Sequence, residues 1–168
     1  SRWYFTQFGD VIVAANNSAK LQTWTINSSS AFADLAASAP IAKFVTTVRD
    51  FVVAANLDGG TNANKVQWSD INDEGTWTSG SASQSDYQII ADGGNITGIT
   101  GGEFGLVLLE RGIVRMSYVG SPYFFQFDNI SRGIGCIDGG SVAQYGGITY
   151  FLSDNGFYAC DGKSVEPI

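Results

Sequence analysis

Histidine is absent from this chain of 168 residues, and cysteine, proline and methionine are scarce, with two, three and one residues. Without histidine, neither a Ser–His–Asp nor a Cys–His catalytic site can be built from the sequence. The only cysteines, Cys136 and Cys160, form no CxxC pair, so they indicate neither a zinc site nor a disulfide framework. We expect both to be buried free thiols.

Positive charge is also in short supply. Nine Lys and Arg residues stand against sixteen Asp and Glu residues, which gives a formal net charge of −7. The cations are scattered singly, whereas proteins that bind nucleic acid need clustered Lys and Arg. No apolar run approaches the roughly 18 residues of a membrane helix. We therefore expect a solvated acidic surface, no specific nucleic-acid binding and no membrane contact.

Glycine and aromatic residues are abundant by contrast, with 21 Gly, eleven Phe, seven Tyr and four Trp. Together with short apolar runs, this composition is typical of many short strands joined by tight turns. The chain starts without methionine and ends at residues 166–168 in a strand-like pattern. We expect residues 1–168 to be a single β-propeller-like domain excised from a longer chain.

An internal repeat gives the strongest fold signal. Residues 8–16 (FGDVIVAAN) match residues 48–56 (VRDFVVAAN) at five identical positions, and weaker copies occupy residues 103–109 and 145–152. The equivalent residues Val11, Phe51, Leu106 and Ile148 are spaced by 40, 55 and 42 residues. Periods of about 40–50 residues with β-strand patterning are typical of propellers. The long middle interval contains a polar stretch, residues 78–86, which we expect to be an inserted loop.

Each copy repeats the same order of strands and turns. A nearly continuous apolar strand is predicted at residues 11–15, 51–55, 106–109 and 148–152, as expected for strands buried on both faces. A fourth strand is predicted at residues 87–90 in copy two and 123–127 in copy three, whereas residues 30–42 in copy one suggest a loop or helical turn and copy four ends without one. The pattern predicts an all-β, propeller-like array of about four blades, with a β-sandwich as the alternative.

Residues 69–77 (SDINDEGTW) are the segment of the chain that most resembles a motif found in enzymes. They resemble the Asp-box turn of sialidase-like propellers, Ser-x-Asp-x-Gly-x-Thr-Trp, but Gly75 and Thr76 are adjacent here. Such a turn locks a blade hairpin through bonds from Asp to the backbone and a packed Trp. A sialidase would also need an arginine cluster for its substrate carboxylate. No sequence pattern places three of the five arginines together (Arg2, Arg49, Arg111, Arg115, Arg132).

The other candidate sites have plainer interpretations. Asp73 and Glu74 could act on a glycoside, but adjacent turn carboxylates are more often solvated. The glycine-rich residues 101–105 precede a predicted strand and not a helix. There is therefore no helix N-terminus at this position to bind a phosphate group. Asp58, Asn62 and Asn64 could bind calcium weakly, or form an ordinary loop. We assign no catalytic, cofactor-binding or metal residues, expect no cofactor, and predict that the chain is not an enzyme.

The last third of the chain resembles a known family in the order of its segments: residues 96–104 (ITGITGGEF), 105–109 (GLVLL), 112–116 (GIVRM), 133–136 (GIGC) and 156–168 (GFYACDGKSVEPI). Residues 66–70 (VQWSD), followed by Thr76 and Trp77, add to the likeness. This order resembles the tail nozzle proteins (tail hub, head-completion stabilisation proteins) of short-tailed bacteriophages.

The resemblance implies a structural virion protein, made in the bacterial cytoplasm and located in the phage tail. Its partners would be the portal and adaptor and the tail fibres or spikes, with a homo-oligomeric ring in the full-length protein. An acidic wall suits a DNA channel, because like charge keeps the sliding polymer off it.

The alternative is a carbohydrate-binding or adhesin propeller on a virion or cell surface. Its signature would be exposed loop aromatics, for which Trp24, Trp77, Tyr87, Tyr118 and Tyr123 are the candidates, whereas Trp3 and Trp68 are expected in the core.

Overall fold

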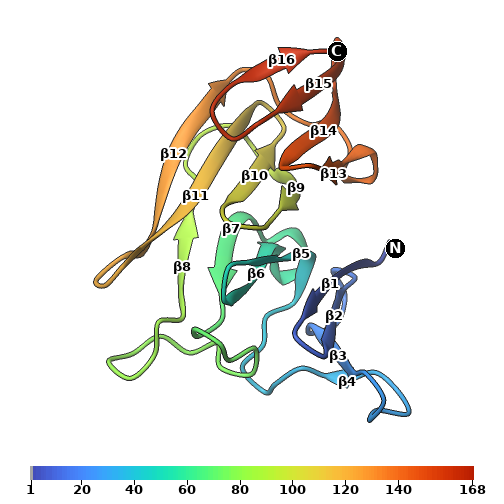
Figure 1. Ribbon diagram of the computed structural model, residues 1–168, viewed down its shortest axis with the longest axis vertical. Coiled ribbons are helices and arrows are strands. Elements are labelled where there is room, and N and C mark those ends of the chain that lie inside the picture. Colours follow the sequence, from blue (N-terminus) through green and yellow to red (C-terminus); the bar gives the residue numbers. More distant parts are fainter. Residues whose placement is uncertain (1) are drawn as a thin grey trace. The chain divides into compact units, whose positions relative to one another are not determined.

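The computed structural model describes residues 2–168, and within that range every regular element longer than three residues is a β-strand. Two short 3-10 turns, Asp58–Gly60 and Gly139–Ser141, complete the elements. The strands form four antiparallel sheets of four strands each, and within a sheet the strands follow their order in the sequence (Figure 1). The predicted all-β fold with four repeated blades is confirmed.

Each sheet is called a blade below. Blade 1 contains β1 (Tyr4–Phe8), β2 (Val11–Ala15), β3 (Gln22–Thr25) and β4 (Ala33–Asp34). Blade 2 contains β5 (Ala42–Val48), β6 (Phe51–Leu57), β7 (Asn62–Trp68) and β8 (Asp86–Ile89). Blade 3 contains β9 (Ile96–Thr100), β10 (Gly105–Leu109), β11 (Gly112–Gly120) and β12 (Phe124–Arg132). Blade 4 contains β13 (Ala143–Tyr145), β14 (Ile148–Ser153), β15 (Gly156–Cys160) and β16 (Val165–Pro167).

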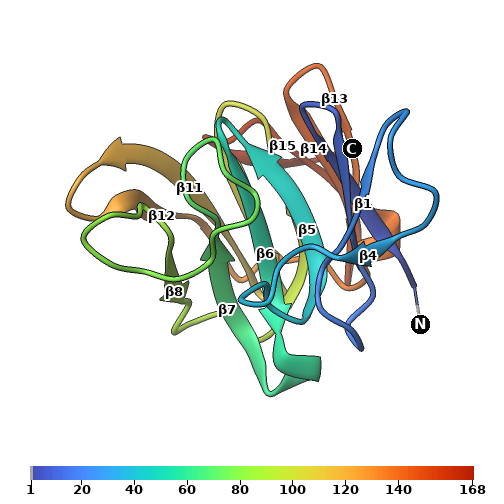
Figure 2. The ribbon, with the colours of Figure 1, turned by 90° about the horizontal axis from the view of Figure 1, so that it is seen from below.

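The four apolar strands predicted from the repeat are β2, β6, β10 and β14. Each is the second strand of a different blade, as the repeat requires, and no two of them pair. Every residue of β6 and β10 is buried, which explains their unbroken apolar sequences. In β14 buried residues alternate with partly exposed ones, so one face of blade 4 is more open than its sequence suggests. Figure 2 shows β6 running between its partners β5 and β7.

Two blades have a fourth strand that the repeat did not assign. In blade 1, β4 pairs with β3 through Gln22 opposite Asp34, in the stretch expected to be a loop or helical turn. The Gln22 side chain also donates to Asp34 Oδ1 at 2.7 Å, which holds this short exposed strand in place. In blade 4, β16 pairs with β15, so the strand-like pattern expected at residues 166–168 belongs to a fourth strand, although copy four was expected to end without one.

The chain divides into two compact units, Ser1–Ile90 with blades 1 and 2, and Ala91–Ile168 with blades 3 and 4. The first unit has an apolar core that combines residues of β2, β5 and β6 with the loop residues Leu21 and Trp77. The second has a core in which Leu106 and Leu108 of β10 pack with Phe151 of β14 and with both cysteines. Each unit thus buries the facing surfaces of two consecutive blades.

The expected insertion lies in the first unit. A long loop, residues 69–85, connects β7 to β8. It starts at residue 69 and not at residue 78 as predicted, and it ends one residue before the predicted residue 86, which is the first residue of β8. Trp68, at the end of β7, is buried as expected. The expectation for Trp3 was wrong: its side chain is 46% exposed, and the residue lies just before the edge strand β1, outside the sheet. Among residues 2–168, no helix is long and apolar enough to span a membrane.

Candidate functional site

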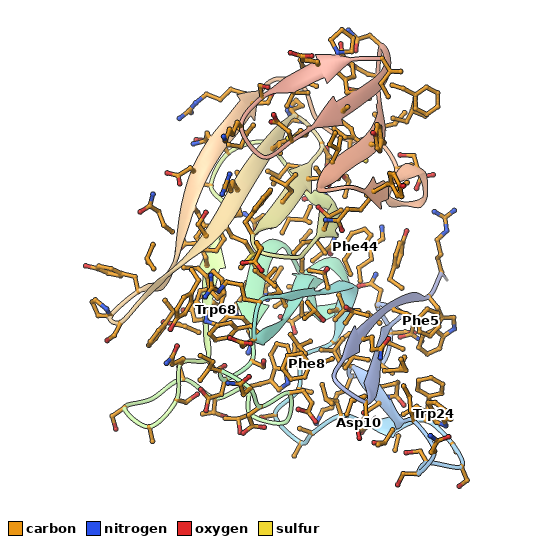
Figure 3. All side chains as sticks on the ribbon, viewed as in Figure 1. Phe5, Phe8, Asp10, Trp24, Phe44 and Trp68 are labelled. Atoms are coloured by element: carbon orange, nitrogen blue, oxygen red, sulfur yellow. The ribbon has the colours of Figure 1, made fainter. Side chains whose placement is uncertain are left out.

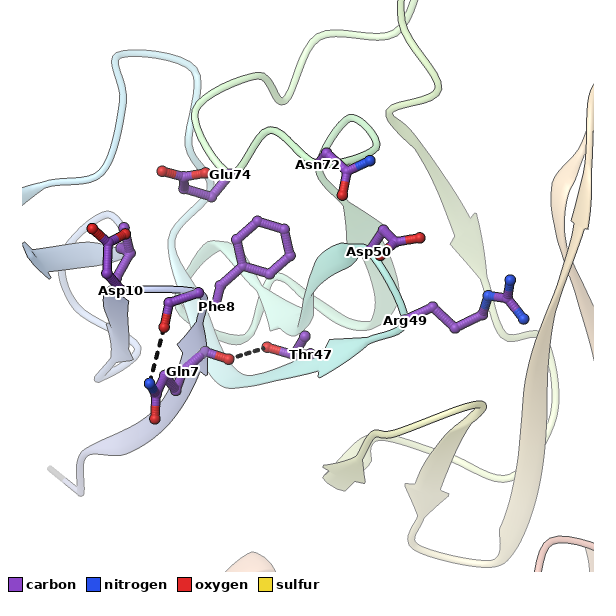
Figure 4. A pocket seen from close by; sticks show the side chains of 10 residues that line it. Gln7, Phe8, Asp10, Thr47, Arg49, Asp50, Asn72 and Glu74 are labelled. Carbon is purple, nitrogen blue, oxygen red and sulfur yellow. Dashed lines mark hydrogen bonds between the residues drawn. The ribbon is translucent and has the colours of Figure 1, made fainter.

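The first unit contains a cavity of about 380 Å³ at one end of blades 1 and 2 (Figure 4). Three turns surround it: the β1–β2 hairpin, the β5–β6 hairpin, and the turn that follows β7. The cavity combines carboxylates, amides and one aromatic ring, supplied by Gln7, Phe8, Asp10, Asp50, Asn72 and Glu74. Gly9, Val11, Thr47 and Arg49 complete its lining, and the Arg49 guanidinium points away from it (Figure 4).

The internal repeat builds two sides of this cavity. Asp10 and Asp50 occupy equivalent positions, each directly before the apolar second strand of its blade. The residue before each aspartate turns the hairpin with positive φ, 60° at Gly9 and 50° at Arg49. The backbone carbonyls of the two aspartates make equivalent hydrogen bonds. The Asp10 carbonyl accepts from Ile26 N–H and the Asp50 carbonyl accepts from Asn72 N–H, both at 2.8 Å.

The third side is the turn that resembles an Asp-box. Asp70 Oδ1 accepts from the backbone N–H groups of Ile71 and Gln84, both at 2.8 Å. Asp73 accepts from Gly75 N–H at 3.0 Å and from the Thr76 hydroxyl at 2.7 Å. These carboxylates therefore hold the turn, as the sequence predicted, and they leave Glu74 and Asn72 to line the cavity.

Trp77 anchors the same turn to the core of the first unit. Its side chain is only 3% exposed and belongs to the core of the first unit, while its indole N–H donates to the Glu74 carbonyl at 2.7 Å. The prediction that this aromatic packs is confirmed. Trp77 is therefore not one of the exposed aromatics considered for glycan binding.

Two aromatics of that set are well exposed. Tyr123 is 76% exposed, and Tyr87 is about half exposed with the Lys65 ammonium 4.1 Å from its ring centre. Trp24 and Tyr118 are partly buried, and Tyr118 packs edge-on against Phe125. The exposed members lie on β8 of the first unit and beside β12 of the second, outside the cavity of Figure 4.

The three residues considered for calcium do not gather their oxygens around one point. Asn62 donates its amide to Asp58, whereas Asn64 donates its amide to the Ile90 carbonyl at 3.1 Å. Asn62 and Asn64 both lie in β7, and they were expected in a loop. Among residues 2–168, no group of three or more His, Cys, Asp or Glu side chains is placed to hold a metal ion.

Two of the arginines have clear structural roles. Arg111 forms an exposed ion pair with Glu110, at 3.5 Å. The guanidinium of Arg115 lies over the Phe104 ring, 4.0 Å from its centre, and donates to the Gly162 carbonyl at 3.1 Å. Arg49 is the one arginine that lines the cavity.

Both cysteines are free and buried, as predicted. Burial raises the pKa of the Cys160 thiol, and the Gly162 backbone N–H, which donates to its sulfur at 3.4 Å, opposes this shift only in part. The Cys136 thiol donates to the Asp138 carbonyl at 3.3 Å. A buried thiol with a raised pKa is a poor nucleophile, so the geometry at Cys160 favours a packing role.

Chemically, the cavity can accept hydrogen bonds from a polar ligand and offers it one aromatic surface. It has no hydroxyl or thiol nucleophile paired with a base, since its only hydroxyl, that of Thr47, donates to the Gln7 carbonyl at 3.0 Å and contacts Thr6. The sequence repeat already showed the equivalent aspartates, but only the folded turn at residues 69–77 brings Asn72 and Glu74 beside them.

No protein-family model matches the chain. No curated protein matches it either.

Proposed function

We propose that the chain is a non-catalytic structural component of a phage tail, part of the nozzle or hub ring below the portal. There it would surround the DNA channel and seat fibres or spikes, in contact with the portal–adaptor assembly. One observation supports the non-catalytic part of this proposal. The carboxylates of the Asp-box-like turn, Asp70 and Asp73, accept hydrogen bonds from backbone N–H groups and from the Thr76 hydroxyl, and so they hold the turn. The phage part rests on the resemblance of the last third of the sequence.

The charge of the chain supports a role beside DNA that does not include gripping it. The formal net charge is −7, and two of the nine cations, Arg111 and Arg115, are engaged with Glu110 and with Phe104. A wall with this balance repels phosphates, and so it lowers friction on a polymer that slides past.

A direct test of this charge argument uses labelled duplex DNA and fluorescence anisotropy at near-physiological salt. The wild-type chain should not bind. A control variant with four exposed aspartates changed to lysine moves the formal net charge from −7 to +1 and should gain salt-sensitive binding; the four are Asp10, Asp50, Asp92 and Asp154. Tight binding by the wild type, or glycoside turnover above the buffer rate in a fluorogenic assay, would contradict the proposal.

A second candidate function is carbohydrate binding, favoured specifically by the cavity of Figure 4. Carboxylates and amides around an apolar surface suit a sugar ring, whose hydroxyls donate and whose C–H face packs on an aromatic side chain such as Phe8.

A glycan array of bacterial surface polysaccharides would test the binding. If it detects binding, the double change Asp10→Asn with Asp50→Asn should remove the signal, while the exposed control Asp92→Asn should retain it. A silent array, or equal binding by both variants, removes this candidate.

A further inference from the structure

The cavity of Figure 4 has an uneven balance of charge. Three carboxylates line it, those of Asp10, Asp50 and Glu74. Arg49 is the only cation among the lining residues, and its guanidinium points away from the cavity. All the lining residues belong to the first unit, so the arrangement of these charges depends on blades 1 and 2 alone.

The three carboxylates are not used to hold the fold. Asp10, Asp50 and Glu74 each accept a hydrogen bond through the backbone carbonyl. Within residues 2–168, their side-chain oxygens accept no hydrogen bond and form no ion pair. Asp70 and Asp73 differ in this respect, because their side-chain oxygens hold the neighbouring turn. The cavity carboxylates are therefore available to a ligand.

Phe8 supplies a fixed aromatic surface among these carboxylates. Its side chain is partly buried and packs against the core of the first unit, which holds the ring in place. Figure 3 shows Phe8 on the side of blade 1 opposite Phe5, and Figure 4 shows its ring between Glu74 and Asp50. An aromatic face packs against the C–H groups of a sugar ring and attracts a nearby cation.

The spacing of the carboxylates suits an organic ligand better than a metal ion. In the part of the chain that the structure describes, no three His, Cys, Asp or Glu side chains are placed to hold a metal. A polyhydroxylated cation matches acceptors that are spread around a ring, because its ammonium and hydroxyl groups are spread as well. The cavity volume of about 380 Å³ lies in the range of small-molecule sites, about 300–1,000 Å³.

We propose that this cavity binds an amino sugar with a free ammonium group and rejects acidic sugars. The inference rests on the carbohydrate-binding candidate named above and adds the class of sugar. The ammonium group forms charge-assisted hydrogen bonds with the cavity carboxylates, and ring hydroxyls donate to the amide oxygen of Asn72. The carboxylate of an acidic sugar would meet three carboxylates and no cation, and like charges repel.

An NMR titration with two trisaccharides tests the class of sugar. The chitosan trisaccharide and cellotriose share their ring and linkage, but cellotriose has a hydroxyl in place of each ammonium group. The chitosan trisaccharide should shift the backbone amide signals of residues 8–11, 49–50 and 72–74. Cellotriose should bind at least about tenfold more weakly, because its hydrogen bonds to the carboxylates are not charge-assisted. The corresponding trisaccharide of glucuronic acid should show no binding at about 10 mM.

Two double variants of equal charge separate the cavity from general charge attraction. Asp10→Asn with Asp50→Asn, and the control Asp92→Asn with Asp154→Asn, both move the formal net charge from −7 to −5. The cavity variant should weaken binding of the chitosan trisaccharide about tenfold or more. The control changes exposed residues of the second unit and should bind as the wild type does. Phe8→Leu retains an apolar side chain and should weaken binding about two- to fivefold.

Each contrary outcome has a definite meaning. Equal affinity for the chitosan trisaccharide and cellotriose overturns the inference and leaves the carbohydrate candidate standing, and so does an array that detects only other glycans. Equal loss of affinity in the two double variants also overturns it, because binding then reflects net charge and not the cavity. If no trisaccharide binds and the array is silent, the inference and the carbohydrate candidate both fail.

Discussion

Replacing Trp77 with alanine should lower the free energy of unfolding by about 3–5 kcal/mol. The side chain is 3% exposed and packs in the core of the first unit, between the Asp-box-like turn and the two blades. Its removal leaves a cavity the size of an indole, which the rigid strands around it cannot fill by relaxing. The lost hydrogen bond to the Glu74 carbonyl adds little, because the net contribution of one hydrogen bond is only about 1 kcal/mol.

The substitution Trp77→Phe separates packing from hydrogen bonding. Phenylalanine retains most of the apolar contact but loses the indole N–H, so the expected cost is about 1–2 kcal/mol. For a chain of this length, each kcal/mol shifts the melting temperature by about 2–4 °C. Alanine should therefore lower the melting temperature by about 6–20 °C, clearly more than phenylalanine does.

Urea unfolding followed by circular dichroism measures both variants against Tyr123→Ala, which removes an aromatic that is already exposed. The control should unfold within about 0.5 kcal/mol of the wild type. If Trp77→Ala unfolds at the wild-type urea midpoint, the turn does not pack as described. If Trp77→Phe costs as much as alanine, the hydrogen bond and not the packing carries the stability.

Four further predictions concern the packing of the blades. Phe51→Ala should cost about 3–5 kcal/mol in the same assay, because this β6 side chain is 1% exposed; a wild-type midpoint would contradict its burial. Gly135→Ala should unfold the chain more readily than Gly80→Ala, since a Cβ at Gly135 would overlap the backbone at the end of β10, whereas Gly80 faces open space. Alkylation without reductant should modify Cys136 and Cys160 only after unfolding, and mass spectrometry should then find two labels; a native disulfide would leave none. Since the folded state holds the Cys160 proton more tightly, its contribution to stability is complete at neutral pH and should decline as the pH rises above about 8.5; a flat profile would contradict the raised pKa.

The blades were predictable because their strongest sequence signal is local. An unbroken apolar run such as that of β6 or β10 identifies a strand buried on both faces, and its recurrence identifies the repeat. The turn at residues 69–77 was also predictable, because Asp73, Thr76 and Trp77 form their side-chain hydrogen bonds within the turn itself.

The features that were missed depend on neighbours distant in the sequence. The two-residue strand β4 exists because β3 offers a partner edge, and nothing in its own exposed residues favours a strand. The strand β16 contains Pro167, which is tolerated because β16 is an edge strand. Trp3 lies just before the edge strand β1, outside the sheet, and the cavity depends on where the loop after β7 folds back. Neither the exposure of Trp3 nor the position of the cavity can be predicted from a periodic pattern in the sequence.

We propose above that this chain is a structural element of a phage tail. Electron microscopy of particles purified from a phage whose genome carries this sequence tests that proposal most directly. We expect density for four-stranded blades arranged in a ring around the tail axis, below the portal and adaptor. Absence of the chain from purified particles, or density confined to a fibre tip or the capsid surface, would contradict it.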